Sequence, residues 1–203
     1  MSRGSKQTTP EAILKVTRRL MSKRGYEKVS LRDIAAELGI SQGNLTYYYK
    51  TKAALIEAAI MDKHEKRPDL KPVSSLGEFD ALLEEIQKLQ KEHLYYFRQY
   101  SQLSVISENV KKKQIKVFQD IKRICRKTFG NLCHAGLMKE ESHKGQYKML
   151  IQIIRFISAH WYEQDVLNES LGLETPSARI AIWETLFPHL TDKGKKIYLE
   201  QIR

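Results

Sequence analysis

Several features that other classes of protein depend on are scarce or missing in this chain of 203 residues. It has only two cysteines, Cys125 and Cys133, too few for a disulfide scaffold. Eight residues apart on one helix, they would also lie too far apart to bridge each other. No segment reaches the roughly 18 uninterrupted apolar residues of a membrane span, because Gln152 and Arg155 interrupt the longest run, residues 149–159. We therefore expect reduced thiols and no membrane association.

Sequence motifs for catalysis and metal binding are also missing. The six histidines are scattered, and the nearest approach to a metal site, Cys133-His134 followed by His143, lacks a convincing fourth ligand. There is no Gly-rich phosphate loop, nucleophile elbow or zinc-protease motif. We expect a protein that is not an enzyme and uses no cofactor or metal. Because no apolar stretch follows the charged N-terminus, we see no secretory signal and expect a cytoplasmic location.

What the chain does have is positive charge, concentrated at one end. The net charge is +11, and residues 1–52 hold eleven Lys and Arg against four Asp and Glu. This concentration is typical of a module that binds a polyanion, although a solvated basic face is an equally good interpretation of charge alone.

Signals for helices recur along the chain, and signals for strands are nearly absent. Thr9-Pro10 has the form of an N-cap followed by a proline at the first helical position, and Gly25 ends that first helix. Ser30 and Asp33 form a capping box with Asp in place of the preferred Glu. Gly39 then allows a tight turn, and Ser41 can cap a third helix. The pattern predicts an all-α protein that begins with a helix, a tight turn and a helix.

These N-terminal residues resemble a known family. The chain from about residue 10 to residue 60 is similar to the N-terminal DNA-binding domain of TetR/AcrR-type bacterial transcriptional regulators. The resemblance rests on Gly25-Tyr26, Val29 to Ala35, Leu38 to Ser41, Gly43, Leu45, Tyr48 to Lys52 and Leu55. It implies a three-helix helix-turn-helix domain followed by a larger C-terminal helical domain for regulation and dimerisation. One departure concerns Thr46, where the family usually has tyrosine, and the extra aromatic residue Tyr47 after it.

The second helix of a helix-turn-helix enters the major groove, which gives its exposed side chains a role. Gln42 and Asn44 carry amides that can pair with adenine, and Gly43 lets the backbone come close to DNA. Leu45 and Tyr49 are expected to face inward, whereas Tyr47 and Tyr48 project toward phosphates and sugars. The resemblance matches Lys52 to a phosphate-binding lysine and Arg32 to a position that reaches bases or backbone. The expected DNA-binding residues are Arg32, Gln42, Gly43, Asn44, Thr46, Tyr47, Tyr48, Thr51 and Lys52.

Two prolines in the polar stretch 67–75 mark the expected domain boundary, with residues 1–66 as the DNA-binding domain and 67–203 as the effector-binding and dimerisation domain. Apolar spacing predicts long helices from Leu76 to Tyr100, from about 110 to 133 and from about 146 to 168. The fourth helical region is expected to begin at Thr175-Pro176. Pro188 should kink or divide that region, with residues 193–203 as a short final helix.

The family resemblance also implies a homodimer, because two recognition helices related by a twofold axis read a palindromic operator. The helix around residue 155 is apolar on more than one face, and we assign it, with the Trp183 helix, to the dimer interface. The alternative is that these residues fill the monomer core. The expected interface residues are Ile153, Ile154, Ile157, Trp183, Leu186 and Phe187.

An effector pocket for an unknown apolar or amphipathic small molecule is a further implication of the family. Its candidate lining is aromatic and comprises His93, Tyr96, Phe97, Tyr100, Phe118, Phe156, His160 and Trp161. Aromatic residues at helical spacing also form ordinary core, so this alternative stays open. The basic run from Lys111 to Lys113 is expected to be a solvated helix face that can also graze DNA or an acidic partner.

The leading hypothesis is a homodimeric, sequence-specific DNA-binding regulator, a repressor that an effector releases from its operator. One alternative is a DNA-binding adaptor whose helical domain recruits another protein and binds no effector. Another is a basic helical protein that coats nucleic acid without sequence preference.

Overall fold

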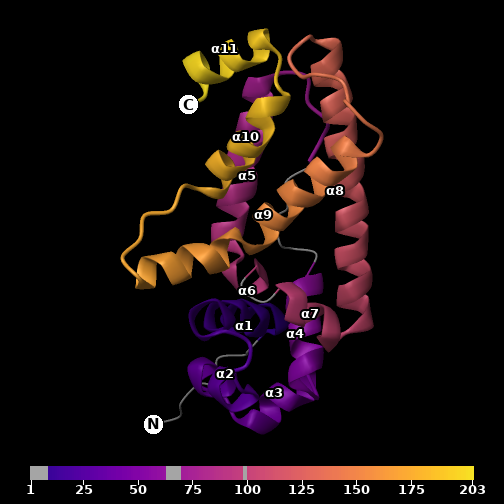
Figure 1. Cartoon of the computed structure of the whole chain (residues 1–203). Coiled ribbons are helices and arrows are strands. Elements are labelled where there is room, and N and C mark those ends of the chain that lie inside the picture. Colours follow the sequence, from indigo (N-terminus) through magenta and orange to yellow (C-terminus); the bar gives the residue numbers. More distant parts are fainter. Residues whose placement is uncertain (1–8, 63–69, 98–99) are drawn as a thin grey trace. The chain divides into compact units, whose positions relative to one another are not determined.

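The computed structural model describes residues 9–62, 70–97 and 100–203, whose regular structure is helical (Figure 1). Only one isolated antiparallel bridge, between Met138 and Leu190, interrupts that pattern in these ranges. The elements in chain order are α1 (Pro10–Arg24), α2 (Leu31–Leu38), α3 (Gln42–Tyr48), α4 (Lys52–Met61), α5 (Leu76–Glu92), α6 (Leu94–Phe97), α7 (Tyr100–Ile106), α8 (Glu108–His134), α9 (Gln146–Ser170), α10 (Ala178–Leu186), the 3-10 helix η1 (Phe187–His189) and α11 (Asp192–Gln201). An all-α fold is therefore confirmed. None of the described helices combines the length and apolarity needed to cross a membrane.

The chain packs as two compact units. Unit 1 comprises Met1–Lys66 and His93–Gln114, and unit 2 comprises Arg67–Glu92 and Ile115–Arg203. Residues 93–114 therefore pack with the N-terminal helices, although they follow α5 in the sequence. The functional division at residues 66 and 67 stays a prediction.

Hydroxyl side chains begin each of the first four helices. The Thr9 hydroxyl accepts from the Ala12 N–H at 3.2 Å, and Ser30 and Asp33 form the expected capping box. The Ser41 and Thr51 hydroxyls accept from the N–H groups three residues on, each at 3.1 Å. Each cap satisfies a backbone donor that the helix itself leaves without a partner, and so fixes where the helix starts.

The described residues of unit 1 form two apolar clusters. The first joins α1, α2, α3 and α4 and includes Ile13, Ile34, Leu45, Leu55 and Ala59. The second adds residues from 93–114 to α1 and α4: Met21, Ile56, Ile60, Tyr95, Leu103 and Val110. Polar contacts reinforce the second cluster, because the Tyr95 N–H donates to the Ser22 hydroxyl and Glu57 accepts from Ser107 and Asn109.

The predicted single helix from Leu76 to Tyr100 was wrong. It is divided into α5, which ends at Glu92, and the four-residue α6, and α7 begins at Tyr100. Buried Tyr95 belongs to the core of unit 1, whereas buried Phe79 and Leu83 belong to that of unit 2. Apolar spacing continues across the break because both sides are buried, but they are buried in different cores. Helix α4 ends at Met61, with Asp62 as its C-cap.

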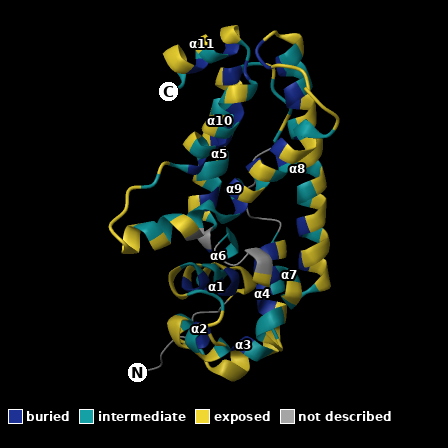
Figure 2. Cartoon of the chain, viewed as in Figure 1, coloured by how far each residue is buried: buried dark blue, intermediate teal, exposed yellow. Residues whose placement is uncertain are grey.

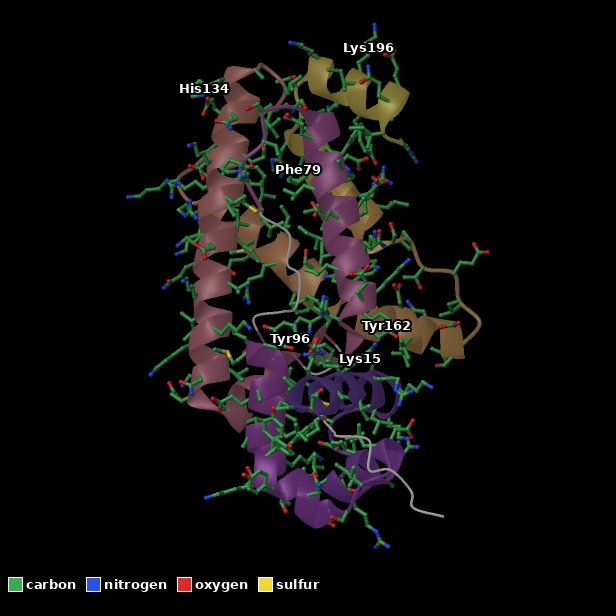
Figure 3. All side chains as sticks on the ribbon, turned by 180° about the vertical axis from the view of Figure 1, so that it is seen from behind. Lys15, Phe79, Tyr96, His134, Tyr162 and Lys196 are labelled. Carbon is green, nitrogen blue, oxygen red and sulfur yellow. The ribbon has the colours of Figure 1, made fainter. Side chains whose placement is uncertain are left out.

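Unit 2 is built from α5, α10, α11, α9 and most of α8 around one large apolar cluster. Figure 3 shows Phe79 pointing in among these helices, whereas His134 and Lys196 point outward. Asp80 of α5 ties the unit together, because its carboxylate accepts from Arg179 Nε at 2.6 Å and from Trp183 Nε1 at 2.8 Å. Arg179 and Trp183 both lie on α10, so one carboxylate fixes α10 against α5.

The last helical region differs from the prediction at its start. Helix α10 begins at Ala178, and its cap is Ser177 rather than Thr175, since the Ser177 hydroxyl accepts from the Ile180 N–H. Pro188 lies in η1 and divides α10 from α11, as expected.

Candidate nucleic-acid interface

Helix α3 is held in place by a tight turn and one buried anchor. Gly39 has a φ of 69°, the left-handed conformation that favours glycine, and it ends α2 while the N–H of Ile40 donates to the Ala35 carbonyl. Ser41 caps α3 two residues later. Leu45 is fully buried, and it is the only buried residue of α3. The turn and this anchor leave most of the helix surface facing solvent.

The solvent face of α3 carries the expected polar and aromatic side chains. Gln42, Gly43 and Asn44 are exposed, and Figure 2 shows α3 largely in the colour of exposed residues. Tyr47 is 83% exposed and Tyr48 40% exposed, and their rings meet edge to face with centroids 5.4 Å apart. Tyr49 instead packs against the unit 1 core. The tyrosine run is therefore split between surface and core, as the sequence predicts.

The structure shows the surroundings of two further α3 residues, Thr46 and Gly43. The Thr46 hydroxyl donates within its own helix, toward the carbonyls of Gln42 and Gly43 at 3.1 Å each. Its proton is therefore engaged, and its oxygen remains an acceptor. At Gly43 an added Cβ would meet only the Ser41 hydroxyl, at 3.8 Å. The protein itself gives no steric reason for glycine at this position.

The start of α4 places a cation beside a free helix end. Lys52 is the first residue of α4, where unpaired backbone N–H groups and the helix dipole favour anions. Its Nζ lies 4.2 Å from the centroid of the Tyr26 ring and donates to the Glu27 carbonyl at 3.4 Å. Burial lowers the pKa of Lys52, while Glu27 and Asp33 act in the opposite direction. A partly desolvated ammonium interacts more strongly with an incoming phosphate than a fully hydrated one.

The remaining expected residues are Arg32 and Thr51. Arg32 is the second residue of α2 and is exposed, and Thr51 is exposed with its hydroxyl engaged as the cap of α4. All nine expected DNA-binding residues thus lie in unit 1 on α2, α3 and the start of α4, exposed or half-buried. Sequence reasoning missed Tyr26 and Glu27 as supports for Lys52, because neither is adjacent to it in the chain.

The expected effector residues are distributed over both units. His93, Tyr96 and Phe97 belong to unit 1, where Tyr96 packs against the second apolar cluster. Phe118, Phe156, His160 and Trp161 belong to unit 2. Phe156 is 65% exposed and lies against the His160 ring, and Trp161 donates through Nε1 to the Pro176 carbonyl at 2.8 Å. The side chain of Tyr100 lies outside the described residues.

The expected dimer residues fall into two groups. Ile154, Ile157, Trp183 and Leu186 are buried within a single chain, in the core of unit 2. They therefore have almost no surface to offer a second copy. Ile153 is 38% exposed, and Phe187 is half-buried beside the Tyr198 ring.

A capped three-helix arrangement with an exposed polar helix after a glycine turn is that of a helix-turn-helix DNA-binding protein. The comparisons agree, since residues 13–59 match the family model for bacterial regulatory proteins of the tetR family. Residues 13–59 therefore form a tetR-type DNA-binding domain, and the chain as a whole is similar to TetR-type transcriptional regulators.

The chain is also similar to a named relative and to solved structures. The chain is 24% identical over 142 residues to the HTH-type transcriptional regulator UidR of Escherichia coli K12, covering 69% of each chain. It also shares its fold with a TetR-family regulator from Marinobacter aquaeolei VT8, at 18% identity, with a TM-score of 0.77 and coverage of 95% of this chain and 96% of that one. A further structural neighbour is NalD of Pseudomonas aeruginosa, at 16% identity, a TM-score of 0.58 and coverage of 90% and 95%.

Proposed function

We propose that this regulator is a homodimeric repressor that binds a palindromic operator and leaves it when a small molecule binds the C-terminal domain, residues 67–203. Sequence-specific DNA binding is supported by the exposed face of α3, where Gln42, Asn44 and Tyr47 are exposed and Leu45 is buried. Amides at the start of a recognition helix are suited to reading base edges, and Lys52 at the start of α4 is suited to holding a phosphate.

A dimer is supported by an apolar stripe on α9. Met149, Ile153 and Phe156 follow one another at helical spacing and are 62%, 38% and 65% exposed. Ile180 on the neighbouring α10 is also exposed. A row of large apolar side chains in water is costly for a single chain, and a twofold-related copy would cover it. We therefore propose Met149, Ile153, Phe156 and Ile180 as the centre of the interface.

Release by an effector requires that the small molecule bind the DNA-incompetent shape more tightly than the DNA-bound shape. A repressor role is supported by one structural neighbour, since NalD is described as the secondary repressor of a multidrug efflux pump. Sequence-specific repression also explains why base-reading amides accompany the positive charge of the N-terminal region.

The deciding experiment selects bound duplexes from a random pool and then measures variants on the winning sequence and on random DNA. We expect a palindromic winner. Gln42→Ala and Asn44→Ala should each cost about 1 to 3 kcal/mol on the winner and little on random DNA. Lys52→Ala should weaken both duplexes alike and reduce the salt slope by about one. Lys196→Ala, the same change at an exposed position of α11, is the matched control. If no sequence is enriched from the pool, the result would favour a protein that coats nucleic acid without sequence preference.

A further inference from the structure

Helix α9 has a third face in addition to its core face and its exposed apolar stripe. Leu150, Ile154 and Ile157 face the core of unit 2, and Met149, Ile153 and Phe156 face solvent. Between these two faces, Gln152, Arg155 and Tyr162 recur at helical spacing and are all half-buried. A cation at partial burial on this face needs a physical explanation, because half-buried charge is costly unless it is paired.

Among the described residues, the partners of Arg155 are all neutral. Its Cζ lies 4.5 Å from the centroid of the Phe118 ring on α8, and its Nε donates to Gln152 Oε1 at 3.2 Å. Within the described part of the chain, no carboxylate lies within ion-pair distance of this guanidinium. Arg179 in the same unit shows the contrast, because Asp80 accepts from both its Nε and its Nη2. The fold can therefore pair an arginine fully, and yet no described residue gives Arg155 an anionic partner.

The geometry of Arg155 suits recognition of an anion. The Phe118 ring and Gln152 fix the plane of the guanidinium, while its two terminal nitrogens have no hydrogen-bond acceptor among the described side chains and backbone. Those nitrogens are not sealed from solvent, since no buried side-chain nitrogen or oxygen of the described chain lacks a partner. A planar guanidinium with its terminal N–H groups available is the arrangement that binds a carboxylate through two parallel hydrogen bonds.

The surroundings of this guanidinium are apolar. On α8, Cys125 lies two turns after Phe118 on the same face, and burial raises the pKa of its thiol to about 11. On α9, Ala159 lies one turn after Arg155 and is buried. Apolar neighbours along both helices strengthen an ionic contact made beside the Arg155–Phe118 pair and favour a ligand with an apolar body.

We propose that Arg155, supported by Phe118 and Gln152, binds the anionic group of the effector, and that this effector is a small organic acid with an apolar or aromatic body. The inference rests on the proposed function, in which the C-terminal domain receives an effector. It replaces a generic apolar ligand with a defined chemical class.

The test compares acids with their own amides. Benzoate, 2-naphthoate, hexanoate and octanoate, each with its primary amide, are added at 1 mM to the full chain, and thermal unfolding is followed. We expect at least one carboxylate to raise the midpoint by 2 °C or more and its amide to have no effect. Arg155→Gln should abolish the shift, and Arg155→Lys should retain a fraction of it. Arg126→Gln, the same change at an exposed position of α8, should behave as the wild type. Circular dichroism of each variant without ligand confirms that it is folded.

The outcomes separate this inference from the proposed function. If acids and amides act alike, if none of the acids acts, or if Arg155→Gln responds as the wild type, the assignment of Arg155 is overturned. Release of the selected operator is measured by fluorescence anisotropy with the same compounds. Arg155-dependent binding without release would support the anion site and contradict release by an effector. Release by a neutral amide in both wild type and Arg155→Gln would support effector release and contradict the anion site.

Discussion

The ammonium of Lys52 lies over the ring of Tyr26, with Nζ 4.2 Å from the ring centroid. Tyr26 follows the end of α1 and Lys52 begins α4, so two separate segments of unit 1 meet at this contact. The Glu27 carbonyl accepts from the same nitrogen. Together the ring and the carbonyl restrict where a long, flexible side chain can place its charge, which lowers the entropy lost when it meets a phosphate.

Replacing Tyr26 should therefore weaken DNA binding without removing any charge. We expect Tyr26→Leu to lower the affinity for operator and random DNA alike by about two- to fivefold, in line with a cation–π contact of about 0.5 to 1 kcal/mol. Tyr26→Phe keeps the ring and should bind as the wild type. Anisotropy titrations at several salt concentrations check this, since Tyr26→Leu should keep the wild-type salt slope. A reduced slope would mean that Lys52 no longer reaches the phosphate.

Gly43 should prove necessary for DNA binding and dispensable for folding. An added methyl group meets only the Ser41 hydroxyl at 3.8 Å, and alanine favours a helix by up to about 1 kcal/mol over glycine. Gly43→Ala should thus raise the free energy of unfolding slightly while it weakens operator binding about tenfold, because the methyl group holds the backbone away from DNA. Urea unfolding and anisotropy measure the two effects. Unchanged affinity would show that DNA does not approach this part of the backbone.

A single charge in the α9 stripe should separate the proposed dimer. Phe156 is 65% exposed in one chain, so Phe156→Glu should fold normally, but it would bury a carboxylate between two copies. We expect the dissociation constant of the dimer to rise at least about 100-fold, as expected when a central apolar contact is lost. Analytical ultracentrifugation at micromolar concentration measures it. Leu199→Glu, at an exposed leucine of α11, is the control and should stay dimeric.

The contact of Glu57 with Ser107 and Asn109 should make the stability of unit 1 depend on acid pH. Hydrogen bonds lower the pKa of Glu57 below its usual 4.5, and the bond from Ser107 contributes more than the bond from Asn109. The carboxylate therefore stabilises the folded state above about pH 5, and this contribution is lost as the pH falls through the lowered pKa. At pH 7, Glu57→Gln should unfold at a lower urea concentration than the wild type. The difference between the two midpoints should shrink toward pH 3. A constant difference would contradict this source of the pKa shift.

Local chemistry made the DNA-binding unit predictable from the sequence. The hydroxyl caps at Thr9, Ser30 and Ser41 each act within three residues and occur as expected, and Thr51 caps α4 in the same way. The positive φ of Gly39 is likewise a local requirement. The inward direction of Leu45 follows from helical spacing once α3 is placed.

The rest depended on contacts between distant segments. Apolar spacing marks Trp183 and Ile154 as buried but does not distinguish the core of one chain from an interface between two, and the structure places both in the core. No proline or glycine marks the break after α5. The path of the chain there is determined instead by the burial of Tyr95 in one cluster with Met21 and Ile56. The pairing of Arg155 with Phe118 was missed for a similar reason, since 37 residues separate them.

The dependence of α3 on one buried leucine has a consequence for how such regulators diversify. Because only Leu45 ties this helix to the interior, substitutions at its other positions carry little folding penalty. A duplicated copy of the gene can therefore drift toward a new target site while the scaffold stays intact, and selection can act on DNA preference almost independently of thermostability.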